Sequence, residues 1–363
     1  MPPYRVAIIG LGRIASTIDD EVQGEPGVML PYSHMACYRE VPAVAVVAGA
    51  EPYAEQRQAF RQRWGLERLY DDYREMLERE QPDIVSVATS AKPRPGIVMD
   101  CARAGVRVIF AEKPIAFSLA EADAMIATCR EHGAKLAINC SRHWDANWNR
   151  ARELIDAGEI GRVLQVNGFG QAGVSHNGSH LIDLVRYLAG GEVCWVFGEM
   201  ESDEKAAGDD DLMGNGYLAF DNGVRAFVRM FPSGGASWEF EVIGESGRLR
   251  SLAGGRAFEW WQVEPGKRRG EPVQRLFPRP QRLQSPGVRA VHDLVQCLET
   301  GKQPNCSGED GRAALEVAIA LRQSHRQEGC RVGLPLADRG LLIRSAETLA
   351  GDLPQALQRH SKG

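Results

Sequence analysis

Five short apolar runs, separated by stretches that can form helices, occupy the first 140 residues and constrain the fold more than any other feature. The runs are rich in β-branched residues and almost continuously apolar, as expected for parallel strands that are buried on both faces. They cover residues 5–9, 43–47, 83–88, 106–110 and 135–139. Helices are expected between them, at residues 53–64, 72–80, 95–104 and 118–132. Ser118 and Glu121 have the spacing of a capping box at the start of the last helix. The alternation predicts a doubly wound Rossmann-type α/β domain over residues 1–140.

The pattern changes after residue 140, which predicts a second domain over residues 141–340 and a polar tail over residues 341–363. Strands now follow one another without long helices between them, which favours an antiparallel sheet. Asn222-Gly223 is a strong hairpin signal, and residues 244–247 form a second tight turn. The expected strands are residues 214–220, 224–231, 237–243, 247–252 and 257–263, and helices are expected at residues 146–157, 287–299 and 308–327.

Length and composition are those of a soluble two-domain protein. The chain has 363 residues, of which 44% are hydrophobic and 25% charged, with a net charge of −5. This balance gives no broad attraction for nucleic acid, and no uncharged apolar run approaches the roughly 18 residues of a membrane span. The eight cysteines lie singly, which favours a reducing cytoplasm.

A glycine turn follows the first predicted strand directly. Gly10, Gly12 and Ala15 form a G-x-G-x-x-[GA] pattern, with Arg13 and Ile14 between them, at the point where a helix is expected to open. Gly10 would permit the tight turn, Gly12 would let the backbone approach a pyrophosphate, and Ala15 would allow close packing of helix on strand. The alternative is an ordinary glycine turn, but the strand–turn–helix context favours a dinucleotide site.

Glu51, at the end of the second strand, is placed to accept hydrogen bonds from a ribose and to repel a 2′-phosphate, which favours NAD over NADP. It lies farther from the glycine turn than usual because residues 17–33 form an insertion. The insertion either covers the cofactor, which would bring Tyr32 and His34 near it, or is merely surface. Arg57 could allow NADP or could be a solvated helix charge.

Several further motifs stand in a characteristic order. They are Ala88-Thr89, Ala111-Glu112-Lys113-Pro114, Asn139-Cys140-Ser141-Arg142, His180-Leu181-Ile182-Asp183 and residues 308–315. Together with the glycine turn and Glu51, they resemble the glucose-fructose oxidoreductase/inositol dehydrogenase/rhizopine-catabolism (Gfo/Idh/MocA) family over residues 4–335. The resemblance implies a second domain with a large, open, mostly antiparallel sheet. It also implies NAD(P)-linked chemistry on a sugar, cyclitol or related hydroxyl compound, with Thr89, Glu112 and Lys113 beside the cofactor.

Lys113 and His180 are the predicted acid/base pair. An alcohol carbon must lie against the nicotinamide while a base takes its hydroxyl proton, and imidazole has a suitable intrinsic pKa. Lys113 could hydrogen-bond the same oxygen or relay the proton. Relatives use a lysine and a histidine at the matching positions.

The residues around His180 leave alternatives open. His176 stands where many relatives carry aspartate, so it either shares the proton relay and contacts substrate or is structural. Asp183 either orients His180 or pairs on its own helix. His176, His180 and Asp183 also have the spacing of a metal site, but no H-E-x-x-H motif is present and we predict no metal. Arg142, Trp144 and Asn177 are further candidate substrate contacts, with core burial the alternative for Trp144.

These features predict an NAD-dependent oxidoreductase of a polyol or sugar that assembles as a homodimer or homotetramer. One rival is an NAD-using glycosidase or lyase that oxidises its substrate transiently. Another is a non-catalytic nucleotide sensor. Net accumulation of NADH would separate the first interpretation from both rivals.

Overall fold

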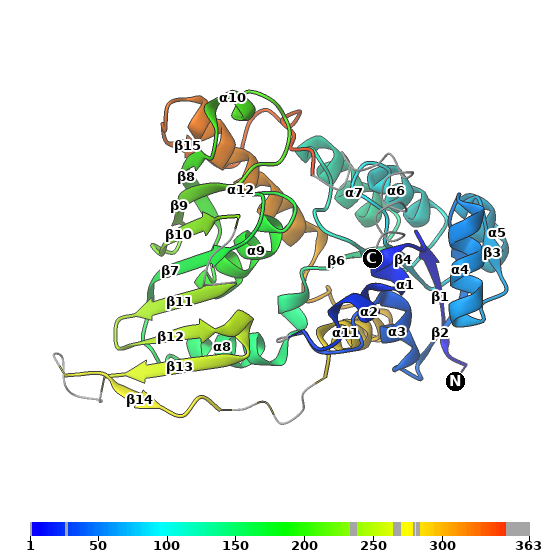
Figure 1. Cartoon of the computed structure of the whole chain (residues 1–363), viewed down its shortest axis with the longest axis horizontal. Helices are drawn as coiled ribbons and strands as arrows, with labels where there is room; N and C mark the ends of the chain where they lie inside the picture. The colour runs from blue at the N-terminus through cyan, green and yellow to red at the C-terminus, as the bar shows by residue number, and fades with distance from the viewer. Residues whose placement is uncertain are drawn as a thin grey trace.

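The computed structural model describes residues 2–25, 28–232, 238–263, 270–278, 280 and 284–345. Its first half contains a sheet of six parallel strands in the order β3-β2-β1-β4-β5-β6 (Figure 1). The strands are β1 (Tyr4–Ile9), β2 (Val44–Ala50), β3 (Leu69–Tyr70), β4 (Ile84–Val87), β5 (Val108–Ala111) and β6 (Lys135–Ile138). All five predicted strands are present, and β4 and β5 are buried at every position, as their continuous apolar sequences require. The strand order reverses between β1 and β4, where open α/β sheets bind ligands.

The helices of this half are α1 (Arg13–Ser16), α2 (Ile18–Val22), α3 (His34–Arg39), α4 (Ala54–Trp64), α5 (Tyr73–Glu80), α6 (Arg94–Arg103) and α7 (Leu119–Glu131). The predicted capping box is confirmed, because Ser118 and Glu121 bond reciprocally at the start of α7. The helix expected after the glycine turn is present but short. It ends at Ser16, and α2 follows as a separate short helix within the insertion.

The second half contains a sheet of nine strands in the order β14-β13-β12-β11-β7-β10-β9-β8-β15. These are β7 (Val163–Gly170), β8 (Val193–Met200), β9 (Gly214–Phe220), β10 (Arg225–Met230), β11 (Glu239–Gly244), β12 (Gly247–Leu252), β13 (Ala257–Gln262), β14 (Val273–Arg275) and β15 (Val332–Gly333). Every neighbouring pair is antiparallel except β7 and β10. Both predicted tight turns are confirmed, since they join β9 to β10 and β11 to β12, whereas β7 and β8 were not predicted.

The remaining helices are η1 (Ser141–Trp144), α8 (Ala146–Asp156), α9 (Gly178–Ala189), α10 (Asp203–Ala206), η2 (Ala253–Gly255), α11 (Pro286–Thr300) and α12 (Gly308–Arg326). α9 and α12 lie between the nine-stranded sheet and the first half of the molecule (Figure 1). α11 follows the second-domain strands in sequence but packs against α3 and β5. The two halves are therefore joined by packed helices as well as by the chain between β6 and α8.

The last described residues pack against the body of the protein. The Ile343 amide donates a hydrogen bond to the Phe117 carbonyl at 3.0 Å, and the Ile343 side chain is fully buried. This part of the predicted polar tail is thus an ordered, partly apolar segment. Residues 346–363 of that tail lie outside the described residues.

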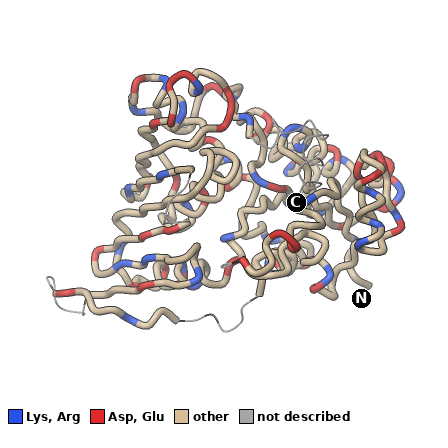
Figure 2. Tube along the Cα trace, viewed as in Figure 1, with Lys and Arg blue, Asp and Glu red and all other residues tan. Residues whose placement is uncertain are grey.

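Charge is distributed without a dominant sign. Figure 2 shows Lys and Arg interspersed with Asp and Glu along both halves of the molecule. None of the helices within the described ranges is long and apolar enough to cross a membrane.

Candidate active site

A cleft of about 480 Å³ lies at the carboxyl ends of the parallel strands and extends to the start of α9. The residues after β1, β4, β5 and β6 form one side, and the insertion before α3 forms another. The lining residues are Arg13, Ile14, Ile18, Val22, Glu25, Val28, Tyr32, Ala88, Thr89, Ser90, Arg94, Glu112, Lys113, Asn139, Ser141, His176, Asn177, His180, Pro286 and Gly287. The cleft therefore collects residues from both halves of the molecule, including the predicted Lys113 and His180.

The glycine turn has the geometry that its sequence predicts. Gly10 has φ +86°, and a Cβ there would lie 3.1 Å from backbone atoms of Ala88 and Thr89. A Cβ on Gly12 would meet only the end of Gln56, at 3.8 Å, so the backbone at Gly12 is open to a ligand. Ala15 is fully buried, as close helix packing requires.

One polar atom beside this turn has no protein partner. The Thr89 hydroxyl is buried, lies on a cleft-lining residue and has no hydrogen-bond partner among the described residues. A buried polar group of this kind normally requires a partner, so it fits a site that is completed by a polar ligand. Together with the open backbone at Gly12, it shows that the residues present are compatible with a bound dinucleotide.

Glu51 supports the glycine turn directly. One carboxylate oxygen accepts a hydrogen bond from the Leu11 amide at 3.1 Å, and the other accepts one from the Tyr53 amide at 3.3 Å. Burial raises the pKa of Glu51, while these two hydrogen bonds and the charge of Arg57 act in the opposite direction. Arg57 donates to the carbonyls of Glu51 and Pro52, so it braces this corner instead of projecting freely into solvent.

The inserted segment lines the cleft, which resolves the alternative left open by the sequence. Ile18, Val22, Glu25, Val28 and Tyr32 all contribute to the lining. The Asp19 carboxylate, in the same segment, accepts hydrogen bonds from the amides that follow Pro31, at 2.7 and 3.0 Å. The insertion is therefore a wall of the site and is more than a surface loop.

His34 lies beneath the cleft instead of in it. Its side chain is 3% exposed, with Nε2 at 3.0 Å from Glu112 Oε1 and Nδ1 at 3.0 Å from Ser86 Oγ. Asn139 also donates to Glu112 Oε1, at 2.6 Å. Burial opposes ionisation of Glu112, but the bond to His34, the charges of His34 and Lys113 and the bond from Asn139 lower its pKa to about 2. A buried carboxylate is thus fixed next to Lys113.

Lys113 projects from the end of β5 towards the second half of the molecule. Its Nζ donates a hydrogen bond to Asn177 Oδ1 at 3.1 Å. Asn177 immediately precedes α9, which carries His180 in its first turn. This bond therefore links the two predicted catalytic segments across the cleft.

His180 is a buried imidazole whose pKa lies well below its usual value. Burial is the main cause, and the positive charges of Arg142, Lys113 and His176 act in the same direction. Its Nδ1 has no hydrogen-bond partner among the described residues. The ring is therefore neutral near pH 7 and can accept a proton.

His176 lies in the cleft but not on the helix. α9 begins at Gly178, and the His176 amide donates to Asp211 Oδ2 at 2.7 Å. His176 and His180 therefore do not share a helical face, and the metal-binding arrangement considered from their spacing is not formed.

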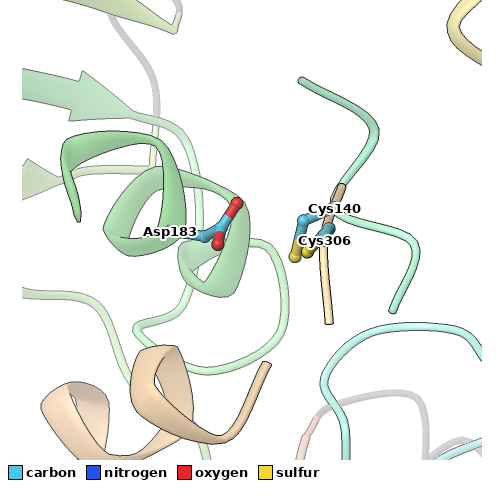
Figure 3. Close-up of side chains that lie close together, drawn as sticks. All are labelled: Cys140, Asp183 and Cys306. Carbon is cyan, nitrogen blue, oxygen red and sulfur yellow. The ribbon is translucent and has the colours of Figure 1, made fainter. Parts of the chain in front are cut away.

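Two predicted site residues are corrected by the structure. Asp183 is 1% exposed, and its Oδ2 lies 2.9 Å from His143 Nε2, so it neither orients His180 nor reaches substrate. Figure 3 shows its carboxylate directed towards the sulfurs of Cys140 and Cys306, and Asp183 does not line the cleft. Trp144 is 1% exposed, and its indole donates to Asp293 at 3.0 Å, so no face is available to a sugar. Asp183 instead lies 3.9 Å from Arg186 on its own helix and Trp144 is buried in the core, which are the alternatives that the sequence left open for each.

Arg94 was not identified from the sequence. It is 1% exposed, lines the cleft and donates to the carbonyls of Thr89 and Pro114, so it ties together the segments that follow β4 and β5. Ser90, Asn139 and Ser141 also line the cleft. Asn139 and Ser141 belong to one of the ordered motifs of the sequence, whereas the only sequence signal of Ser90 is that it follows the carboxyl end of a parallel strand.

A doubly wound parallel sheet, a glycine turn open to a ligand and a lysine–histidine cleft between two domains define a dinucleotide-binding, two-domain oxidoreductase. The chain belongs to the Gfo/Idh/MocA oxidoreductase family. Residues 4–140 match the family's NAD-binding Rossmann fold, and residues 167–334 match its C-terminal alpha/beta domain.

Named relatives match over most of the chain. D-Apiose dehydrogenase of Paraburkholderia graminis is 27% identical over 326 residues, covering 81% of this chain and 84% of that protein. Myo-inositol 2-dehydrogenase of Thermotoga maritima is 26% identical, covering 88% and 96%.

Solved structures share the same two-domain fold. Aldose-aldose oxidoreductase of Caulobacter crescentus, complexed with glycerol, has a TM-score of 0.76 at 23% identity, covering 92% of this chain and all of that one. Levoglucosan dehydrogenase, complexed with NADH and L-sorbose, has a TM-score of 0.75 at 20% identity over the same shares. Because the sequence identities are this low, the similarity to these two structures shows a shared fold only.

Proposed function

We propose that the protein transfers a hydride between a nicotinamide and a hydroxyl-bearing carbon of a sugar, cyclitol or related polyol. The observation that carries the proposal is the presence of Lys113 and His180 in one cleft with the open glycine turn. When bound, NAD⁺ supplies the hydride acceptor. The relatives named as apiose and inositol dehydrogenases support this class of substrate.

The protein's own residues move the proton. Neutral His180 accepts the proton of the substrate hydroxyl, and Lys113 donates a hydrogen bond to the same oxygen. Asn177 holds the lysine amine in position through the 3.1 Å bond. We assign His176 an assisting role, and Arg142 and Asn177 roles in contacting substrate hydroxyls.

We assign the dinucleotide to the glycine turn. Gly10, Gly12, Arg13, Ile14 and Ala15 would hold the pyrophosphate side. Thr89, Glu112 and Lys113 would lie beside the nicotinamide half. Glu51 favours NAD, because its carboxylate at the end of β2 would repel a 2′-phosphate.

The test is a comparison of Lys113→Ala and His180→Ala with wild type on a panel of sugars, sugar acids and inositols. Loss of a positioned acid/base should lower kcat/KM by about 10² to 10⁴-fold. NAD binding, followed by protein fluorescence, should persist in both variants. His292→Ala and Lys205→Ala, which remove exposed side chains that do not line the cleft, are the controls. Near wild-type turnover in both cleft variants would refute the assignment.

A closed redox cycle is the second candidate. A relative named 2,7-anhydro-N-acetylneuraminate hydratase, from Mediterraneibacter gnavus, is 31% identical over 159 residues, or 38% of this chain. A cycle in which the hydride returns to the product would leave no net NADH. Formation of one NADH for each substrate molecule consumed, with any compound of the panel, would support the dehydrogenase over the closed cycle.

We also propose that two or more copies associate through the open face of the nine-stranded sheet. Phe197, Tyr217 and Phe227 lie side by side on β8, β9 and β10, and Phe227 is 51% exposed. They line a hollow of about 580 Å³ on the face away from α12. Exposed apolar patches of this kind commonly bind another protein surface. Light scattering should show a smaller assembly for Phe227→Lys than for wild type, and an unchanged mass would contradict the proposal.

A further inference from the structure

A second chamber adjoins the cleft, and Arg142 is the only residue of its walls that the proposed chemistry uses. It has a volume of about 400 Å³ and shares Val28, Tyr32, Ser141 and Pro286 with the cleft. Its other walls come from η1, the start of α8 and the η2 turn, and they include Arg142 of η1 and Arg256 at the end of η2. We call this space the arginine chamber. Because the two spaces share these four residues, the arginine chamber lies directly beside the cleft that contains His180.

Within the described part of the chain, neither Arg142 nor Arg256 forms an ion pair. Arg142 is half-buried, and its charge is close enough to His180 to lower that residue's pKa. A guanidinium in a partly closed space is well suited to bind a carboxylate or phosphate, because it offers a planar fork of donors.

The chamber is built from well-fixed parts. The Arg142 guanidinium lies 4.8 Å from the centre of the Trp238 ring, an arrangement that orients its donors. Gly255, next to Arg256, is held by a hydrogen bond from Asn147 Nδ2 to its carbonyl at 3.1 Å. A Cβ on Gly255 would lie 2.6 Å from Trp148 Nε1, so the η2 turn packs directly on α8.

The acidic residue of the chamber does not cancel this charge. Asp145 caps α8, where its Oδ1 accepts hydrogen bonds from the amides of Asn147 and Trp148. Burial raises the pKa of Asp145, while these two hydrogen bonds and the charges of Arg142 and Arg289 act in the opposite direction. Asp145 therefore offsets part of the Arg142 charge, but its Oδ1 is already used in capping α8.

We propose that the arginine chamber binds an anionic group on the substrate, so that the preferred substrate is a sugar acid or a sugar phosphate and not a neutral polyol. This inference rests on the proposed function. Arg256 and Arg142 would bind the anion while the hydroxyl-bearing carbon lies at His180. A carboxylate and a phosphate share this chemistry, and matched compounds distinguish them.

The experiment measures NAD⁺ reduction with D-glucose, D-gluconate, D-glucuronate and D-glucose 6-phosphate, together with the corresponding galactose series. Wild type should give a higher kcat/KM for at least one anionic member than for its neutral counterpart. In Arg256→Gln that ratio should fall by about 10- to 100-fold, the loss expected for a hydrogen bond to a charged group. Arg256→Lys should restore part of it, and Arg250→Gln, which removes an exposed arginine on β12, should keep the wild-type ratio. Comparing kcat/KM for D-gluconate and D-glucuronate with kcat/KM for D-glucose 6-phosphate shows whether a carboxylate or a phosphate is preferred.

A parallel calorimetric titration of the NAD-loaded protein with the same compounds separates the two proposals. Equal or better use of neutral sugars by wild type, or an unchanged ratio in Arg256→Gln, would overturn the arginine chamber and leave the oxidoreductase standing. Binding of an anionic sugar that Arg256→Gln abolishes, with no hydride transfer from any compound, would support the chamber and refute the proposed function.

Discussion

His34 Nε2 lies 3.0 Å from Glu112 Oε1, and this contact joins a buried polar chain to the residue that precedes Lys113. On the other side of the ring, Nδ1 lies 3.0 Å from Ser86 Oγ, which in turn lies 2.8 Å from the Tyr38 hydroxyl. All four side chains are less than a tenth exposed. A fully bonded buried network of this kind fixes the orientation of its members. Lys113 directly follows Glu112. The network therefore fixes the position of the backbone at the end of β5, from which the Lys113 side chain projects.

The charge of Glu112 should appear in the pH dependence of stability. Its pKa in the folded protein is about 2, below the ordinary 4.5, so it stabilises the fold above pH 4.5 and loses that contribution as the pH falls towards 2. The loss should be on the order of 3 kcal/mol in the free energy of unfolding. Urea denaturation of wild type and Glu112→Gln across this range should show a difference that shrinks as the pH falls.

Glu55→Gln, which neutralises an exposed glutamate on α4, is the control for general acid effects. It should lose stability with falling pH in parallel with wild type. A constant difference between wild type and Glu112→Gln at all pH values would show that the Glu112 carboxylate is not specifically stabilised in the fold.

The lowered pKa of His180 should shape the pH profile of catalysis. Burial, together with the charges of Arg142, Lys113 and His176, keeps the imidazole neutral below its usual pKa of 6.5. The kcat/KM for alcohol oxidation should therefore remain flat through pH 6.5 in wild type, with no acid limb there. Arg142→Gln removes one of the charges that lower the pKa, so an acid limb should move to higher pH. An identical profile in both proteins would show that the Arg142 charge does not act on the base.

The parts of the fold that the sequence predicts are those with local signals. β4 and β5 are continuous apolar runs, and the hairpin at Asn222-Gly223 needs only its own residues. β7 and β8 escaped prediction because Gly168, Gly170 and Gly198 interrupt their alternation, and glycine usually indicates a turn. These glycines serve close packing, since a Cβ on Gly198 would collide with the backbone of Leu321 in α12.

The residues of the candidate site also divide into those with a local sequence signal and those that only tertiary packing brings into place. Lys113 could be placed because it follows a parallel strand, and His180 because relatives carry histidine there. Arg256 is brought to the arginine chamber only by tertiary packing of the η2 turn on α8, which no local pattern encodes. For Asp183 the sequence left two roles open, and the structure favours pairing, with Arg186 on its own helix and with His143, a partner that only the packing of η1 contributes.

Cofactor choice should depend on the charge of Glu51. Glu51→Gln keeps an oxygen that can accept the Leu11 amide hydrogen bond but removes the negative charge at the end of β2. The ratio of kcat/KM for NAD to that for NADP should fall by about tenfold, corresponding to roughly 1.4 kcal/mol. Steady-state kinetics with both cofactors measures it. If Glu51 serves only to brace the glycine turn, the ratio will stay unchanged while both values fall together.

Asp183 should prove structural, and a single substitution separates this role from catalysis. Asp183→Asn leaves His143 buried without its anionic partner, which should lower the free energy of unfolding by about 3–5 kcal/mol.

Burial opposes protonation of His143, but the Asp183 charge prevails and raises its pKa above 6.5. The pair therefore stabilises the fold fully below pH 6.5 and progressively less as the pH rises through that raised pKa, so the deficit of Asp183→Asn should be largest at the acidic end. Asp156→Asn, which breaks an exposed pair with Arg152, should cost less than about 1 kcal/mol. Activity per folded molecule should stay within a few-fold of wild type in Asp183→Asn, because the side chain does not reach the cleft. Full stability with a collapse of kcat would instead mean that Asp183 acts on His180.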